Sequence, residues 1–184
     1  MNSKGAKVTN NCNGFELTII SIAEDFYGAY KRCLEGKNPR VDEWHRIVSD
    51  VVSVPAIVNG AFSIELFLKS LSPLSSKELK KKKHELKQLF LTLDEEDQTV
   101  IREAVEKELM GQYSFDDGLK TINNSFTFWR YIHLKPNLGY GLNVTLKVLN
   151  IFLKVIREYA LHGREKRQPP TERMIHFGRK RVTK

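Results

Sequence analysis

Apolar residues recur along most of the chain at the spacing of an α-helix. The first stripe has steps of three or four residues and consists of Phe15, Ile19, Ile22, Phe26 and Tyr30. Gly36 and Pro39 come after this stripe and predict the end of a first helix. A second helical segment is predicted from near Asp42, with apolar positions at Trp44, Ile47, Val48, Val51 and Val52.

The stretch VPAIVNGAFSIELFLKSL predicts a third helix, which Pro55 opens or kinks. Its few positions that are not apolar are Asn59, Gly60, Ser63, Glu65, Lys69 and Ser70. Because a helix that is apolar on every side must be covered on every side, we expect this one in the middle of a bundle. DVVSVPAIV contains β-branched residues, but Pro55 argues against a central strand.

Further helices are predicted downstream of a turn at Pro73. The first of them buries Leu79, Leu86, Leu89 and Phe90. The next is DEEDQTVIREAVEKELM, whose acidic first turn suits the helix dipole and which Gly111 ends. Another is lined by Phe115, Leu119, Ile122, Phe126 and Trp129. The last runs from about Leu142 to His162, with a polar stripe at Lys147, Asn150, Lys154, Arg157 and Glu158.

These patterns predict an all-α fold, a compact bundle of about six helices. With 184 residues, the chain suits one domain with one core. We expect residues 14–163 to form this domain, residues 1–13 to be a flexible N-terminus, and residues 164–184 to be a flexible basic tail.

Positive charge is concentrated in that tail. The chain carries a net +8 at pH 7, and residues 164–184 hold eight basic and two acidic residues, a net +6. Such an arm is typical of contact with a polyanion, and a tail that only keeps the protein soluble is the alternative. The residues expected to bind nucleic acid are Lys80, Lys81, Lys82, Lys83, Arg179, Lys180 and Arg181.

Composition also sets expectations for compartment and cofactors. No run of about 18 uncharged apolar residues occurs, so no membrane span is expected. The N-terminal residues lack the apolar region of a secretory signal. Cys12 and Cys33 have neither the spacing nor the companions of a disulfide framework or a zinc site. We therefore expect a cytoplasmic protein with no cofactor and no metal.

Glu65 is the polar residue that most needs an explanation, because it stands in the most apolar predicted helix. Taking an ionised carboxylate out of water costs several kcal/mol unless it is paired. Lys69, four residues on, could form a local pair. Arg130, which stands among aromatic residues in SFTFWRYIH, is the long-range partner that we expect, because its fork can hold a carboxylate with two bonds.

Two histidines and two aromatic residues are further candidates. His84, in KKKKHELKQLF, is either an ordinary surface histidine or part of a polar cluster with Glu65 and Arg130. His133 fits the end of an apolar stripe. Trp129 and Tyr131 could stack on bases if exposed, although their periodicity favours packing in the core.

Over about residues 55–133, the chain resembles bacterial proteins of the HEPN superfamily. Three stretches carry this resemblance, NGAFSIELFLKSL, HELKQLF and SFTFWRYIH. The resemblance implies an all-α domain that usually forms a homodimer. It also implies metal-independent endoribonuclease activity in a cleft between two protomers, in toxin–antitoxin, phage-defence or RNA-processing systems. RNA and an antitoxin or defence-system protein are therefore expected partners.

Active members of that superfamily carry an arginine and a histidine separated by four to six residues. The chain contains two such pairs, Arg157 with His162 in REYALH and Arg40 with His45 in RVDEWH. On a straight α-helix, five positions rotate a side chain by roughly 140°. Arg157 and His162 therefore converge only if the last helix bends.

Three functions remain open from the sequence. In a ribonuclease, a histidine would deprotonate the ribose 2′-OH and an arginine would stabilise the developing charge. In a non-catalytic dimeric interaction module, Glu65, His84 and Arg130 would instead tie helices together. In an adaptor, the mobile tail would bind nucleic acid. A cleft lined by Arg157 and His162 at a two-fold interface favours the enzyme, and full burial of the charged trio favours the interaction module.

Overall fold

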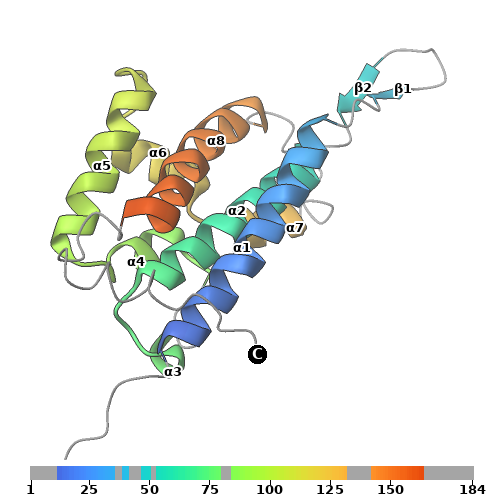
Figure 1. Ribbon diagram of the computed structural model, residues 1–184. Helices are drawn as coiled ribbons and strands as arrows, with labels where there is room; N and C mark the ends of the chain where they lie inside the picture. Colours follow the sequence, from blue (N-terminus) through green and yellow to red (C-terminus); the bar gives the residue numbers. More distant parts are fainter. Residues whose placement is uncertain are drawn as a thin grey trace, which may run out of the picture.

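The computed structural model describes residues 12–35, 39–41, 47–50, 53–79, 84–131 and 142–163, and it confirms the predicted helical bundle (Figure 1). The longer described helices are α1 (Cys12–Glu35), α2 (Ser53–Leu71), α5 (Glu95–Leu109), α6 (Phe115–Ile122) and α8 (Leu142–Glu158). The short ones are α3 (Ser76–Leu79), α4 (Leu86–Phe90) and α7 (Ser125–Arg130). A π-helical turn, Tyr159–Gly163, continues α8, and the hairpin strands are β1 (Pro39–Val41) and β2 (Ile47–Asp50).

Helix α2 lies at the centre of the bundle, as its composition predicted. Helix α1 runs along one side of it, α8 packs on another, and α4 and α7 also contact it (Figure 1). Ile57, Ile64 and Phe67 are among its side chains with no exposed surface. Its length and composition would also suit a membrane-crossing helix, but most of it is buried against other helices. Each large apolar side chain buried in this way contributes about 1.5–3 kcal/mol.

Small residues on α2 let its two main neighbours approach closely. A Cβ atom added to Gly60 would lie 2.7 Å from Leu149 Cδ2 and 3.0 Å from Tyr30 Cδ2. Nearby, the Ser63 hydroxyl donates a hydrogen bond of 2.9 Å to the Ala23 carbonyl. These contacts fix the positions of α1 and α8 relative to α2.

The segment predicted to be a second helix forms a strand in its described part. Strand β2 pairs antiparallel with β1, with Arg40 opposite Ser49, and the hairpin projects beyond the ends of α1 and α2 (Figure 1). Ile47 and Val48 are β-branched, and such residues favour an extended backbone. Strand pairing therefore prevails over the weak helical spacing of this segment.

Two of the predicted helices are broken in the middle, one into α3 and α4 and the other into α6 and α7. The two breaks meet at Asn123. The Leu86 N–H donates to the Asn123 carbonyl at 3.2 Å, and the Lys87 N–H donates to Asn123 Oδ1 at 2.7 Å. Asn123 thus satisfies N–H groups that have no partner within α4. Most of the predicted apolar positions are nevertheless buried, namely Leu79, Leu86, Leu89, Phe90, Phe115, Leu119, Ile122 and Trp129. Phe126, predicted in the same stripe, is only partly buried.

Replacing Gly60 by alanine should destabilise the protein by about 1–3 kcal/mol, because the added methyl group overpacks a rigid contact. Gly28→Ala is the matched control. Its Cβ would approach only the flexible end of Arg32, at 3.3 Å, and alanine favours a helix by up to about 1 kcal/mol over glycine. Urea unfolding of both variants measures the difference. Equal stabilities would contradict the close packing of α1, α2 and α8.

Tyr30 should make stability depend on alkaline pH. Its hydroxyl donates to Asn150 Oδ1 at 2.9 Å, and burial, with a smaller effect of Tyr27, raises its pKa from 10.0 to about 12. The unfolded phenol therefore loses its proton first, so a contribution fully present below about pH 10 disappears as the pH rises to about 12.

We expect a loss of about 2 kcal/mol in unfolding free energy over this window, beyond the loss in Tyr30→Phe. Urea unfolding at a series of pH values compares the two proteins. Parallel pH profiles would show that Tyr30 does not titrate differently in the folded state.

Candidate functional site

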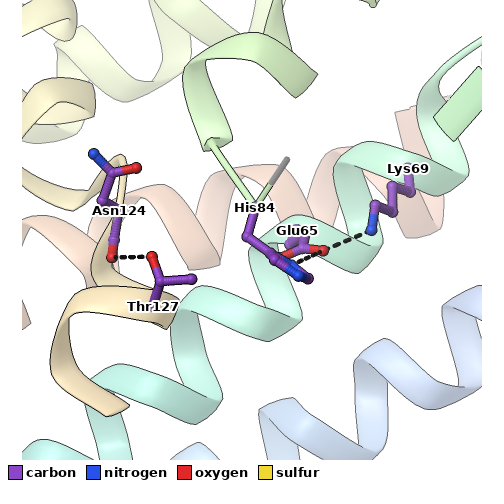
Figure 2. Close-up of polar contacts among 5 residues, drawn as sticks. All are labelled: Glu65, Lys69, His84, Asn124 and Thr127. Carbon is purple, nitrogen blue, oxygen red and sulfur yellow. Dashed lines mark hydrogen bonds and ion pairs between the residues drawn. The ribbon is translucent and has the colours of Figure 1, made fainter. Parts of the chain in front are cut away.

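The Glu65 carboxylate is fully buried and is held by two partners. Its side chain is 0% exposed, the Lys69 ammonium donates to Oε1 at 2.6 Å, and His84 Nδ1 lies 2.9 Å from both oxygens. Figure 2 shows Lys69 one turn along α2 and His84 on the segment before α4, on either side of the carboxylate. Because an ionised carboxylate only accepts hydrogen bonds, Nδ1 carries the hydrogen and Nε2 points away from Glu65.

Arg130 is not the partner of Glu65, so the predicted long-range pair is wrong. Within the described residues, the ion pairs of Glu65 are those with Lys69 and His84. Arg130 is exposed at the end of α7, with its guanidinium 5.1 Å from the Phe126 ring centroid and 5.5 Å from that of Tyr131. The break before α4 brings His84 to the carboxylate, where the sequence had suggested the arginine.

Phe126 nevertheless links His84 to Arg130. The His84 and Phe126 ring centroids are 5.0 Å apart, and Phe62 of α2 stacks on Phe126 at 4.7 Å. Of the three residues predicted as a polar cluster, Glu65 and His84 are therefore in direct contact, whereas Arg130 is connected to His84 only through the Phe126 ring. The three residues differ in burial, because Glu65 is inside whereas the His84 side chain is 47% exposed and Arg130 is also exposed.

Arg157 and His162 line the same hollow. It has a volume of about 630 Å³ and lies between α5 and the end of α8. The turn Tyr159–Gly163 is π-helical, with more residues per turn than an α-helix. The rotation between Arg157 and His162 is therefore smaller than on a straight α-helix. A wider turn therefore reduces the angle between the two residues, where the sequence had suggested that a bend would be needed.

Arg157 is fixed by two side chains of α1. Its Nε donates to Glu24 Oε1 at 2.6 Å, its Nη2 donates to Glu24 Oε2 at 2.7 Å, and its guanidinium lies 4.4 Å from the Tyr27 ring centroid. The hydrogen bonding to Glu24 raises the pKa of Arg157. Nη1 has no hydrogen bond to any residue in the described part of the chain, so it is the nitrogen left for a ligand.

The π-helical turn is tied to the start of α5. The Tyr159 hydroxyl donates to Asp97 Oδ1 at 2.7 Å, and Asp97 is buried in the first turn of α5. Tyr159 also lines the hollow, whereas His162 beyond it is exposed. This hydrogen bond holds the wide turn in place, so the histidine is presented from an anchored segment.

Several predicted residues lie outside the part of the chain that the structure describes. They are His45, Lys80, Lys81, Lys82, Lys83, His133, Arg179, Lys180 and Arg181. The Arg40 and His45 pair falls outside with them, since only the backbone of Arg40 is described. Trp129 is 7% exposed, which confirms its packing in the core, whereas Tyr131 is 50% exposed. Among the described residues, no group of three His, Cys, Asp or Glu side chains could hold a metal ion.

The sequence did not point to the residues that support each candidate. Glu24 holds Arg157 across 133 positions of sequence, and Asp97 holds Tyr159 across 62. Asp97 was recognised only as part of an acidic helix start. Glu24 stood between apolar positions of α1 and looked like an ordinary exposed acid, so no local signal marked it.

Comparisons of the chain with protein-family models, with curated proteins and with solved structures found no match. The resemblance to the HEPN superfamily therefore stays a prediction.

Removing both partners of Glu65 should destabilise the fold strongly. In a Lys69→Met, His84→Ala double variant, a charged group is left buried without compensation, and we expect a loss of about 3–5 kcal/mol in the free energy of unfolding. Adding Glu65→Met to this background should recover most of the loss, because apolar residues of similar volume can replace a buried ion pair at little cost. Urea unfolding provides the measurement. A triple variant no more stable than the double variant would argue against a buried charge at Glu65.

Proposed function

We propose that this chain is an RNA-associated helical domain of HEPN type that cleaves RNA with Arg157 and His162. One observation carries the proposal, namely that both residues line one hollow of about 630 Å³. The sequence criterion for an enzyme was a cleft lined by these two residues at a two-fold interface, and the hollow supports the part of it that concerns the lining residues. The opposing criterion, full burial of Glu65, His84 and Arg130, does not hold, because His84 is half-exposed and Arg130 is exposed.

The chemistry needs one base and one cation. His162 would take the proton of a ribose 2′-OH, whose oxygen then attacks the adjacent phosphorus. The P–O5′ bond breaks, the leaving oxygen gains a proton from solvent, and a 2′,3′-cyclic phosphate remains. Arg157 would stabilise the added negative charge at phosphorus through Nη1. Glu24 and Tyr27 keep the guanidinium in place, so little orientation is lost when the substrate binds.

The expected assembly follows from the resemblance. In active HEPN proteins the cleft is completed by a second copy, so a homodimer is the proposed working form. An antitoxin or another defence-system protein is the proposed partner that would control it. The basic tail, with +6 of the net charge, would attract RNA from a distance.

A non-catalytic interaction module is the second candidate, and one observation favours it. Two of the three guanidinium nitrogens of Arg157 are already bonded to Glu24. The same contact would serve to pair α1 with α8 if no substrate were involved. Loss of the His162 side chain distinguishes the two functions. An enzyme would lose its catalytic base, whereas an interaction module would change little, because this exposed side chain adds little to stability.

The purified full-length protein should cleave single-stranded RNA in the presence of EDTA and leave 2′,3′-cyclic phosphate ends. His162→Ala should lower the rate by about 10²–10⁴-fold because the base is lost. Arg157→Ala should lower it by about 10²–10³-fold because charge stabilisation is lost. Gel analysis of labelled RNA gives the rates, and an RNA with 2′-O-methyl groups should stay intact.

Lys154→Ala is the matched control for this experiment. Lys154 is an exposed cation one turn earlier on α8, and it is paired with Glu108 at 3.1 Å as Arg157 is paired with Glu24. Its loss should leave the rate within about twofold. RNA left intact by the wild-type protein, or cleaved equally by His162→Ala, would rule out the proposed activity.

A further inference from the structure

Four side chains around the end of α7 form a partly exposed surface away from the core, which we call the Phe126 face. Its members are His84, Phe126, Arg130 and Tyr131. The side chain of His84 is 47% exposed, Tyr131 is 50% exposed, and Arg130 is exposed as well. The hollow at Arg157 involves none of these side chains, and the interior of the molecule uses only His84 Nδ1, which pairs with Glu65.

His84 is anchored from the inside of the molecule. Its Nδ1 lies 2.9 Å from both oxygens of the buried Glu65 carboxylate (Figure 2). Its ring also packs on Phe126, with the ring centroids 5.0 Å apart. Nε2 is therefore the nitrogen left for a ligand. A carboxylate that orients a histidine in this way reduces the rotamer freedom that binding would otherwise have to remove.

Arg130 is held between two aromatic rings. Its guanidinium is 5.1 Å from the Phe126 centroid and 5.5 Å from the Tyr131 centroid, both within the range of a cation–π interaction. No ion pair involves Arg130 within the described residues, and residues 123–131 contain no acidic side chain. The fork is thus exposed, close to two aromatic rings and without an acidic partner among the described residues, a combination suited to binding an oxyanion.

We infer that the Phe126 face binds single-stranded RNA, with Arg130 on a backbone phosphate and Tyr131 stacked on the neighbouring base. His84 Nε2 lies beside the same phosphate path. Single-stranded RNA combines an anionic group with an unstacked aromatic ring in each repeat, which matches a guanidinium next to an exposed tyrosine. Bases in a duplex are already stacked, so Tyr131 has no counterpart there. The inference rests on the proposed function only in taking RNA as the ligand.

Binding can be measured without cleavage on the full-length protein. The probe is a fluorescein-labelled, single-stranded 12-nucleotide RNA with 2′-O-methyl groups, which cannot form a 2′,3′-cyclic phosphate. In fluorescence anisotropy, Tyr131→Ala should weaken affinity by about 5- to 100-fold because one stacked base is lost. Arg130→Gln should weaken it by about tenfold because a charge-assisted contact is lost.

Salt dependence separates the two roles. Each phosphate contact to a single strand contributes about 0.7 to the slope of log affinity against log salt concentration. Arg130→Gln should therefore lower the slope by about 0.7, whereas Tyr131→Ala should leave it unchanged. Equal slopes in the wild type and Arg130→Gln would overturn the phosphate contact.

Arg102→Gln is the matched control. Arg102 also lies over an aromatic ring, 4.4 Å from the Phe115 centroid, but it is paired with Asp116 at 2.9 Å. Its replacement should leave RNA affinity within about twofold. If Arg102→Gln weakens binding as much as Arg130→Gln, the attraction is general and the Phe126 face is not a site.

The outcomes distinguish this inference from the proposed function. Loss of binding in Arg130→Gln and Tyr131→Ala supports the Phe126 face even if the wild type cleaves no RNA. Cleavage that depends on His162, with binding unaffected by both variants, supports the enzyme and overturns this inference. A wild-type protein that does not bind the probe also overturns it.

Discussion

Burial of the Glu65 carboxylate constrains much of the structure around α2. An ionised group inside a helical core must be paired, and one partner, Lys69, comes from the same helix at i+4. The other, His84, reaches it only because the chain leaves the helical conformation before α4. That break exposes the N–H groups at the start of α4, and Asn123 accepts hydrogen bonds from them at the break between α6 and α7. The position of Arg130 at the end of α7 follows from the same chain of contacts.

This connection explains why the sequence predicted the buried acid but not its second partner. A lone carboxylate in an apolar helix is visible in the pattern, and the i+4 lysine is a local feature. The helical periodicity through His84 and through Trp129 also predicted the buried positions correctly. Periodicity assumes continuous helices, however, and both breaks depend on hydrogen bonds to Asn123 from a distant segment. The side chain of Arg130 was therefore predicted to reach Glu65, whereas it is exposed at the end of α7.

The site at Arg157 and His162 shows the same difference between what the local sequence predicts and what distant contacts decide. The spacing of Arg157 and His162 was visible in the sequence, and regular α-helical winding argued that they diverge. The π-helical turn that changes this geometry is held by the Tyr159 and Asp97 hydrogen bond, which joins positions 62 apart. Glu24, which orients Arg157, lies 133 positions away. Contacts over such separations produce no periodic pattern in the sequence. Arg157 and His162 could therefore be picked out from the sequence, but their arrangement in space could not.

The wide turn at the end of α8 also affects how the chain can tolerate a change in length. In an α-helix, residues four apart share a face, and the π-helical turn gives a similar relation to two residues five apart. If one residue between Tyr159 and His162 were lost, ordinary winding would keep the histidine on the side of Arg157. The same loss earlier in α8 would rotate the whole end of the helix by about 100°. A residue could therefore be lost at this turn without separating the pair, whereas the loss of a residue in the body of α8 would separate the end of the helix from its contacts.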